Sequence, residues 1–347
     1  MLPQSQNRKQ LPAFSRLELR EAAQDLLPGF AVRRCQHRIA YGREGVDVFS
    51  DTTGRAWLEG AVPCQSVWTC PSCAARIADA RAEDVQGYID AALSKGHGVA
   101  LVTLTFAHQK TDLLSATAAA FSKALKVFKS GRAAAALREK WGILGEIRAV
   151  EATHGANGWH PHSHAILFTD KGLRAADLEI LRGEMFDLWA AACKKTGLGA
   201  PTAARGVDIA GAKHAGGYVA KWGFATELTR GHLKKAQGAG RTPWQILADY
   251  AAGCARSGRL FREFAQQFKG KRQLFYSHGL KKAIGKPVKK PKQKRLDFKI
   301  RLTTVSALDW CLIVEWRLFR QLLHAAAGGR ERLEAFLGGL RWQKKAA

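Results

Sequence analysis

The stretch GWHPHSHAILF, residues 158–168, carries three of the chain's 11 histidines at alternating positions and then becomes apolar. Side chains alternate between the two faces of a β-strand, so a strand here places His160, His162 and His164 on one face. Proline cannot donate to a sheet ladder and is tolerated at the first residue of a strand, so we expect the regular strand to begin at Pro161. His162 and His164 are then its first inward-facing pair.

Glu151 completes a predicted metal site with these two histidines. It lies in GILGEIRAVEATH, residues 142–154, which reads as a long strand, and the short turn that follows favours an antiparallel hairpin. The hairpin would bring the Glu151 carboxylate alongside both imidazoles. A Glu, His, His set with open positions suits Mn²⁺ or Mg²⁺, the first better because it tolerates nitrogen ligands. The alternative is that the histidines only make hydrogen bonds.

The remaining hydrophobic pattern predicts an α+β fold, in which helices cover an antiparallel sheet. Expected helices cover residues 74–95 and 177–195, and the C-terminal region reads as two helices broken at Gly328 and Gly329. Expected strands include 30–40, 56–64 and 99–106. The predicted organisation is a flexible tail (1–28), a cysteine-rich module (29–82), a main domain (83–285), a basic linker (286–302) and a C-terminal helical segment (303–347).

The composition indicates a polyanionic partner. Lys and Arg number 55 against 29 Asp and Glu, a net charge of +26, which favours nucleic acid over the alternative that the charge serves solubility alone. The run KPVKKPKQKR, residues 286–295, has no aromatic residue for base stacking, so we expect it to contact DNA phosphates. Its cationic residues are Lys286, Lys289, Lys290, Lys292, Lys294 and Arg295.

The N-terminal residues lack the apolar core of a signal peptide, and Glu315 and Arg317 interrupt the longest late apolar run. We therefore expect a soluble cytoplasmic protein with no membrane partner.

Four of the seven cysteines fall before residue 74, a distribution that favours metal binding over disulfides. Cys70 and Cys73 form a C-x2-C pair, the spacing with which two thiolates grip Zn²⁺, and Cys64 lies just upstream. Cys35 is the preferred fourth ligand of this structural zinc site, and His37 is the next candidate. The alternative is a set of unpaired buried thiols.

A protein that cuts a DNA strand and conserves the bond energy needs a nucleophile that keeps the phosphate, and Tyr218 is the candidate. It is alone among the five tyrosines in having a lysine one helical turn later, Lys221, on the same face. A tyrosine can retain a phosphate as phosphotyrosine, and the lysine could hold the scissile phosphate or stabilise the phenolate. An ordinary core tyrosine is the alternative. Tyr276 is a rival nucleophile, although its strand setting beside Phe275 favours packing or base stacking.

Three motifs together resemble the HUH endonuclease superfamily. HPHSHAILF is similar to the WHPH-x-H form of rolling-circle replication initiators, LVTLTF (101–106) to their upstream strand motif, and YVAKW (218–222) to the Tyr-x-x-Lys motif of the single-tyrosine plasmid-type branch. RQLFYSHGLKKAIG and the CPSC stretch also resemble segments of these initiators. The resemblance spans about residues 61–285. Ser163 is a departure, because the family usually has a bulky residue there.

The resemblance implies an HUH nuclease domain over residues 83–285. It implies nicking and joining of single-stranded or hairpin origin DNA through a 5′-phosphotyrosine and a divalent metal, which leaves a 3′ hydroxyl for DNA synthesis, with a host helicase and DNA polymerase as partners. His214 stands where single-tyrosine initiators often carry a glutamate, and it could act as a general base or a phosphate contact. A relaxase or HUH transposase, and a non-enzymatic, zinc-stapled nucleic-acid-binding protein, are the alternatives.

Overall fold

The computed structural model describes residues 15–211, 240–285 and 299–346. These residues form two compact units. The five-stranded unit comprises residues 74–211 and 240–285, and the three-stranded unit comprises residues 15–73 and 299–346. Both are antiparallel sheets flanked by helices, which confirms the predicted α+β class. None of the described helices is both long enough and apolar enough to span a membrane.

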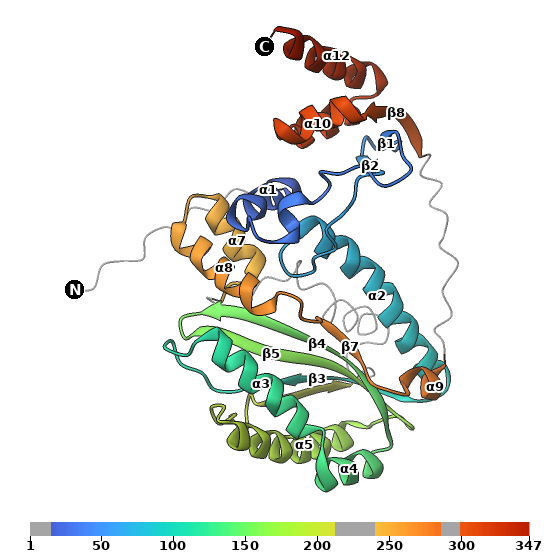
Figure 1. The fold of residues 1–347 in the computed structure, drawn as a ribbon. Coiled ribbons are helices and arrows are strands. Elements are labelled where there is room, and N and C mark those ends of the chain that lie inside the picture. The colour runs from blue at the N-terminus through green and yellow to red at the C-terminus, as the bar shows by residue number, and fades with distance from the viewer. Residues whose placement is uncertain (1–14, 212–239, 286–298, 347) are drawn as a thin grey trace, which may run out of the picture. The chain divides into compact units, whose positions relative to one another are not determined.

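The five-stranded sheet has the strand order β6-β3-β5-β4-β7, with every neighbouring pair antiparallel (Figure 1). The predicted hairpin is formed by β4 and β5, the two longest strands, so the local pairing expected from the short turn is confirmed. The strands are β3 (Gly98–Leu104), β4 (Ile143–Gly155), β5 (Gly158–Thr169), β6 (Val207–Gly211) and β7 (Leu274–Tyr276).

Helices cover both faces of this sheet (Figure 1). On one face, Val85 and Ile89 of α2 pack with Ile166 and Phe168 of β5. On the other face, α3 and α5 pack against the alternate side chains of the same strands. The helices of this unit are α2 (Pro71–Ser94, of which residues 71–73 belong to the three-stranded unit), α3 (Leu114–Phe128), α4 (Gly131–Lys140), α5 (Ala175–Thr196), α7 (Pro243–Ala251), α8 (Ala255–Phe268) and α9 (Leu280–Ile284).

The start of β5 differs from the prediction. The strand begins at Gly158, and Pro161 lies inside it, paired with Ala152 of β4. The pairing of β5 with β3 ends at Ser163, so the described residues leave Pro161 with a strand partner on one side only. A proline is accepted there because the strand has an edge, where a missing N–H leaves no ladder partner unsatisfied.

The three-stranded unit is built from two segments that lie far apart in the sequence, residues 15–73 and 299–346. β1 (Gly45–Ser50) pairs with β2 (Ala56–Glu59) on one side and with β8 (Ile300–Ser306) on the other. Val46 and Val48 of β1 therefore share a core with apolar residues of the C-terminal helices, among them Trp310. The helices of the unit are α1 (Arg16–Leu26), the 3₁₀ helix η1 (Ala31–Arg34), α10 (Ala307–Glu315), α11 (Phe319–Ala327) and α12 (Arg330–Ala346).

Two local predictions were wrong in this unit. Residues 31–34 form η1 instead of a strand, and Gln36 follows with φ +63°, so the chain turns where Cys35 points inward. The C-terminal region forms three helices, because Arg317, with φ +56°, separates α10 from α11 in addition to the expected break near Gly329. In both places a single residue in the left-handed region ends a regular element.

Candidate functional site

Glu151, His162 and His164 converge on one face of the five-stranded sheet. Glu151 is the cross-strand partner of His162, and His164 lies two residues further along β5. Both Nε2 atoms face the same carboxylate oxygen, Oε2 of Glu151, at 3.6 Å from His162 and 3.9 Å from His164. The three side chains are only 11–13% exposed. The site therefore gathers one carboxylate and two imidazole nitrogens in a nearly enclosed position.

The three side chains fit a divalent cation. Their ligand atoms all lie within 4.8 Å of one another. Two atoms that each lie about 2.1 Å from an ion, at angles of about 90–120°, are about 3.0–3.6 Å apart. The observed nitrogen–oxygen distances are longer than hydrogen bonds, and only a small contraction would place them around an ion. One carboxylate and two imidazoles also leave coordination positions open.

Hydrogen bonds on the far sides of the rings orient both imidazoles. Nδ1 of His162 lies 3.1 Å from the main-chain carbonyl oxygen of His160. Nδ1 of His164 lies 3.0 Å from Oγ1 of Thr103, its cross-strand partner on β3. In each ring the atom that faces Glu151 is Nε2. The sequence reasoning did not single out Thr103, although it lies in the LVTLTF stretch.

His160 is turned to a different partner. Its Nδ1 lies 2.9 Å from Nδ1 of His108, and its ring stacks on Phe106 at a centroid distance of 5.6 Å. Burial lowers the pKa of His160 to about 3, and it also lowers the pKa of His108. Two neutral imidazoles, one donating and one accepting, satisfy this contact. The sequence reasoning missed His108, which lies beyond the end of β3 and meets His160 only in the folded chain.

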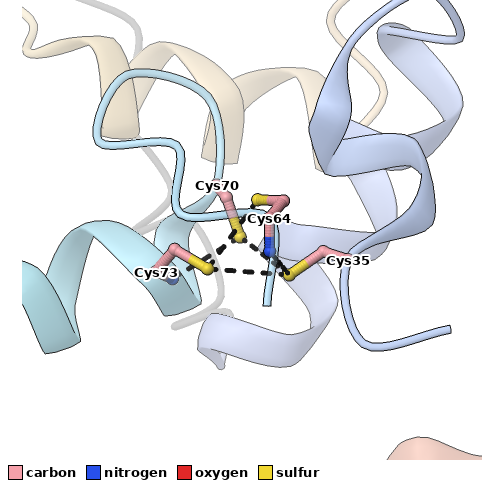
Figure 2. Close-up of side chains that lie close together, drawn as sticks. All are labelled: Cys35, Cys64, Cys70 and Cys73. Carbon is pink, nitrogen blue, oxygen red and sulfur yellow. Dashed lines mark hydrogen bonds between the residues drawn. The ribbon is translucent and has the colours of Figure 1, made fainter. Parts of the chain in front are cut away.

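The four cysteines of the three-stranded unit form a second cluster (Figure 2). Sγ of Cys35 lies 3.6 Å from Sγ of Cys70 and 3.6 Å from Sγ of Cys73, and Sγ of Cys64 lies 3.7 Å from Sγ of Cys73. Four thiolates at about 2.3 Å from a tetrahedral Zn²⁺ would be about 3.8 Å apart, so the cluster fits this ion. Hydrogen bonds from the other thiols lower the pKa of Cys73.

Local structure brings these cysteines together. α2 begins at Pro71, whose fixed φ and missing N–H suit the first helical position, so Cys70 and Cys73 lie on either side of a helix start. The backbone N–H of Cys73 donates to Sγ of Cys70 at 3.5 Å, and that of Cys64 donates to Sγ of Cys35 at 3.4 Å.

His37, the other candidate for the fourth ligand, is not in the cluster. Its Nε2 lies 3.1 Å from Nε2 of Gln24, and its ring stacks on Phe319.

Comparison with known proteins identifies the family of this chain. A model of the replication protein family matches residues 55–321, which is more than half of the sequence. The chain belongs to this family. It is 28% identical over 308 residues to a protein named Protein rep from Streptomyces lividans, with 70% of this chain and 68% of that protein covered. A neomycin resistance protein from Streptomyces cyanogenus is 30% identical over 148 residues, which cover 35% of this chain and 34% of that protein. No solved structure matches.

Membership of the replication protein family supports a replication initiator that binds origin DNA. The predicted catalytic residues Tyr218, Lys221 and His214 lie outside the residues that the structure describes, as does the basic run 286–295.

Tyr276, the other candidate for the nucleophile, lies within the described residues. Its surroundings do not favour the deprotonated phenolate form. Its hydroxyl donates to Oδ2 of Asp84 at 2.6 Å, and its ring contacts Tyr88. Burial and the Asp84 carboxylate raise the pKa of Tyr276.

Proposed function

We propose that this replication protein nicks and joins single-stranded or hairpin DNA at a plasmid rolling-circle origin. The observation that carries the proposal is the convergence of Glu151, His162 and His164, with both Nε2 atoms directed at one carboxylate. Family membership and the net charge of +26 support a DNA partner. The proposed nucleophile is Tyr218, in the Tyr-x-x-Lys motif of the HUH resemblance.

The proposed reaction is a transesterification. The Tyr218 oxygen loses its proton and attacks the scissile phosphorus, and the bond from phosphorus to the 3′ oxygen breaks. The 5′ phosphate stays on the tyrosine, and the 3′ oxygen takes up a proton and becomes a hydroxyl from which a polymerase can prime. Attack by a 3′ hydroxyl on the phosphotyrosine reverses the step and joins a strand. The phosphodiester energy is conserved, so joining needs no other co-reactant.

Each proposed site residue has a distinct task in this reaction. Glu151, His162 and His164 would hold the divalent cation, either Mn²⁺ or Mg²⁺. When bound, the cation would polarise the scissile phosphate and offset the negative charge that builds in the transition state. Lys221 would bind a phosphate oxygen or stabilise the phenolate. His214 would accept a proton or contact phosphate during termination.

Two further groups have supporting tasks. Cys35, Cys64, Cys70 and Cys73 would hold a structural Zn²⁺ that closes the turn before α2. The cationic residues from Lys286 to Arg295 would contact DNA phosphates without reading sequence. A host helicase and a DNA polymerase, acting in the cytoplasm, would use the nicked strand and its 3′ hydroxyl.

A nicking assay tests the proposal. Labelled hairpin oligonucleotides that tile the surrounding replicon are incubated with the full chain and Mn²⁺, with Mg²⁺ or without an added ion. We expect one hairpin to be cut at one position, only with the ion. The downstream fragment should be linked to the protein through its 5′ phosphate, and the upstream fragment should end in a free 3′ hydroxyl. A cut that releases both fragments free of protein would contradict the phosphotyrosine, and no cutting of any replicon hairpin would contradict origin nicking. Cutting only at a transfer or transposon end would favour a relaxase or transposase.

A further inference from the structure

The side chain of Thr103 contacts a ring nitrogen of the cluster that Glu151, His162 and His164 form. It lies on β3 directly opposite His164, and its Oγ1 lies 3.0 Å from Nδ1 of that histidine. Its neighbours on β3, Val102 and Leu104, point into the core on the opposite face of the sheet. The alternation of the strand therefore directs the Thr103 hydroxyl toward the histidine face.

The Nδ1 atoms of the two imidazoles face different kinds of hydrogen-bonding partner. A neutral imidazole has one N–H and one lone pair, and the hydrogen bond at one nitrogen determines which nitrogen is free. His162 Nδ1 faces a main-chain carbonyl, which only accepts, so this nitrogen carries the proton and Nε2 keeps its lone pair. His164 Nδ1 faces a hydroxyl, which can either donate or accept.

We propose that Thr103 is a positioning residue that accepts the Nδ1–H of His164 and thereby presents the Nε2 lone pair of His164 to a divalent cation beside Glu151. The proposal rests on the metal site of the proposed function. Partners of this kind hold metal-binding histidines in one tautomer and one orientation, and their loss typically weakens metal binding about 10–100-fold. The contact at Nδ1 of His162 comes from the main chain, whereas a side-chain substitution at Thr103 can remove the contact at Nδ1 of His164.

The chain offers a matched control at Thr105. This residue lies two positions further on, and its hydroxyl donates to the main-chain carbonyl oxygen of Arg205. Thr103→Val keeps the shape of the side chain and removes the hydroxyl, Thr103→Ser keeps the hydroxyl and removes the methyl group, and Thr105→Val removes the neighbouring hydroxyl.

Mn²⁺ binding to the full-length protein tests the proposal without reliance on activity. Paramagnetic resonance titration with Mn²⁺ should give a dissociation constant about 10–100-fold higher for Thr103→Val than for the wild type. Thr103→Ser should bind Mn²⁺ more tightly than Thr103→Val and close to the wild type, because the hydroxyl acceptor is retained. Thr105→Val should bind like the wild type. A Thr103→Val protein that binds Mn²⁺ within twofold of the wild type would overturn the proposal, and so would a wild type that binds no Mn²⁺.

The tautomer gives a second, independent result. In ¹⁵N spectra of histidine-labelled protein loaded with Mg²⁺, the His164 signals, identified by their loss in His164→Gln, should show a protonated Nδ1 in the wild type. An Nε2–H pattern there would overturn the proposal. If Thr103→Val weakens Mn²⁺ binding as expected but the wild type cuts no DNA, the role of Thr103 stands and the proposed function fails.

Discussion

Glu151 of β4 and His162 of β5 are direct cross-strand partners, and the carboxylate Oε2 of the first lies 3.6 Å from Nε2 of the second. A slip of one residue in this pairing would move one of the two side chains to the opposite face of the sheet. The pairing is continuous through the turn, where Gly155 lies opposite Gly158, so the tight hairpin sets the register of the site.

Removal of a metal ligand should abolish cleavage. We expect Glu151→Gln, His162→Ala and His164→Ala each to lose about 100-fold or more of Mn²⁺-dependent nicking, because each removes a ligand that fixes the ion. His160→Ala is the matched control on the same strand and should lose less, because its ring is paired with His108. Single-turnover cleavage of a labelled hairpin provides the measurement, and equal losses for all three histidine variants would show that His160 belongs to the site.

The cysteine cluster should be structural. We expect one zinc per chain in freshly purified protein, and Cys70→Ser should lose it. Structural zinc sites contribute about 10–16 kcal/mol of apparent binding free energy, which is comparable to the whole stability of a domain, so the three-stranded unit should unfold in this variant. Elemental analysis and thermal unfolding report both effects. Cys311→Ser, at an exposed cysteine, should change neither, and metal-free wild-type protein would remove the claim.

The stability should depend on pH through His160. Burial lowers its pKa to about 3, while an unfolded histidine titrates near 6.5. Between these values the unfolded state binds more protons, so this residue's contribution to the free energy of unfolding is complete above about pH 6.5 and falls as the pH drops, by up to about 1.4 kcal/mol per pH unit. Urea unfolding at pH 6.5, 5.5 and 4.5, without added divalent ion, should show a steeper decline for the wild type than for His160→Gln. Parallel declines would contradict the buried neutral histidine.

Tyr276 should be dispensable for chemistry. Tyr276→Phe removes only the hydrogen bond to Asp84 and should cost about 1 kcal/mol of stability while nicking continues. Denaturant unfolding and the cleavage assay measure the two quantities. A variant that folds but forms no protein-linked DNA would transfer the nucleophile assignment to this residue.

The basic run should anchor DNA without reading it. Replacement of Lys286, Lys289, Lys290, Lys292, Lys294 and Arg295 by glutamine should weaken binding to origin and random DNA alike. The slope of log affinity against log salt should flatten by about 0.7–0.9 per lost phosphate contact. Fluorescence anisotropy at several salt concentrations gives the slopes. If the variant lost its preference for the origin while keeping its affinity for random DNA, the run would be a sequence reader.

The sequence predicts what is local in this fold. Alternating histidines, a short turn and a preceding strand were enough to place Glu151 beside His162 and His164, because hairpin pairing joins neighbours in the chain. The start of β5 was predicted wrongly, because the position of Pro161 depends on where β3 stops, and that is a property of the sheet.

Contacts between segments that are distant in the sequence could not be predicted from local sequence patterns. The pairing of β1 with β8 joins residues about 250 positions apart, and no sequence period signals it. His108 meets His160 across 52 positions, and Thr103 meets His164 across 61. The strand expected over residues 30–40 was replaced by η1 and a left-handed residue, because the chain turns to bring Cys35 to cysteines about 30 residues later.

The most direct test of the account is to locate the covalent link between protein and DNA. The full chain is incubated with the cleaved hairpin and Mn²⁺, the adduct is digested with trypsin and nuclease, and the modified peptide is sequenced by mass spectrometry. We expect a 5′-phosphonucleotide on Tyr218, present in the wild type, absent in Tyr218→Phe and strongly reduced in His162→Ala. An adduct of normal yield in Tyr218→Phe, with the nucleotide on another residue, would contradict the account.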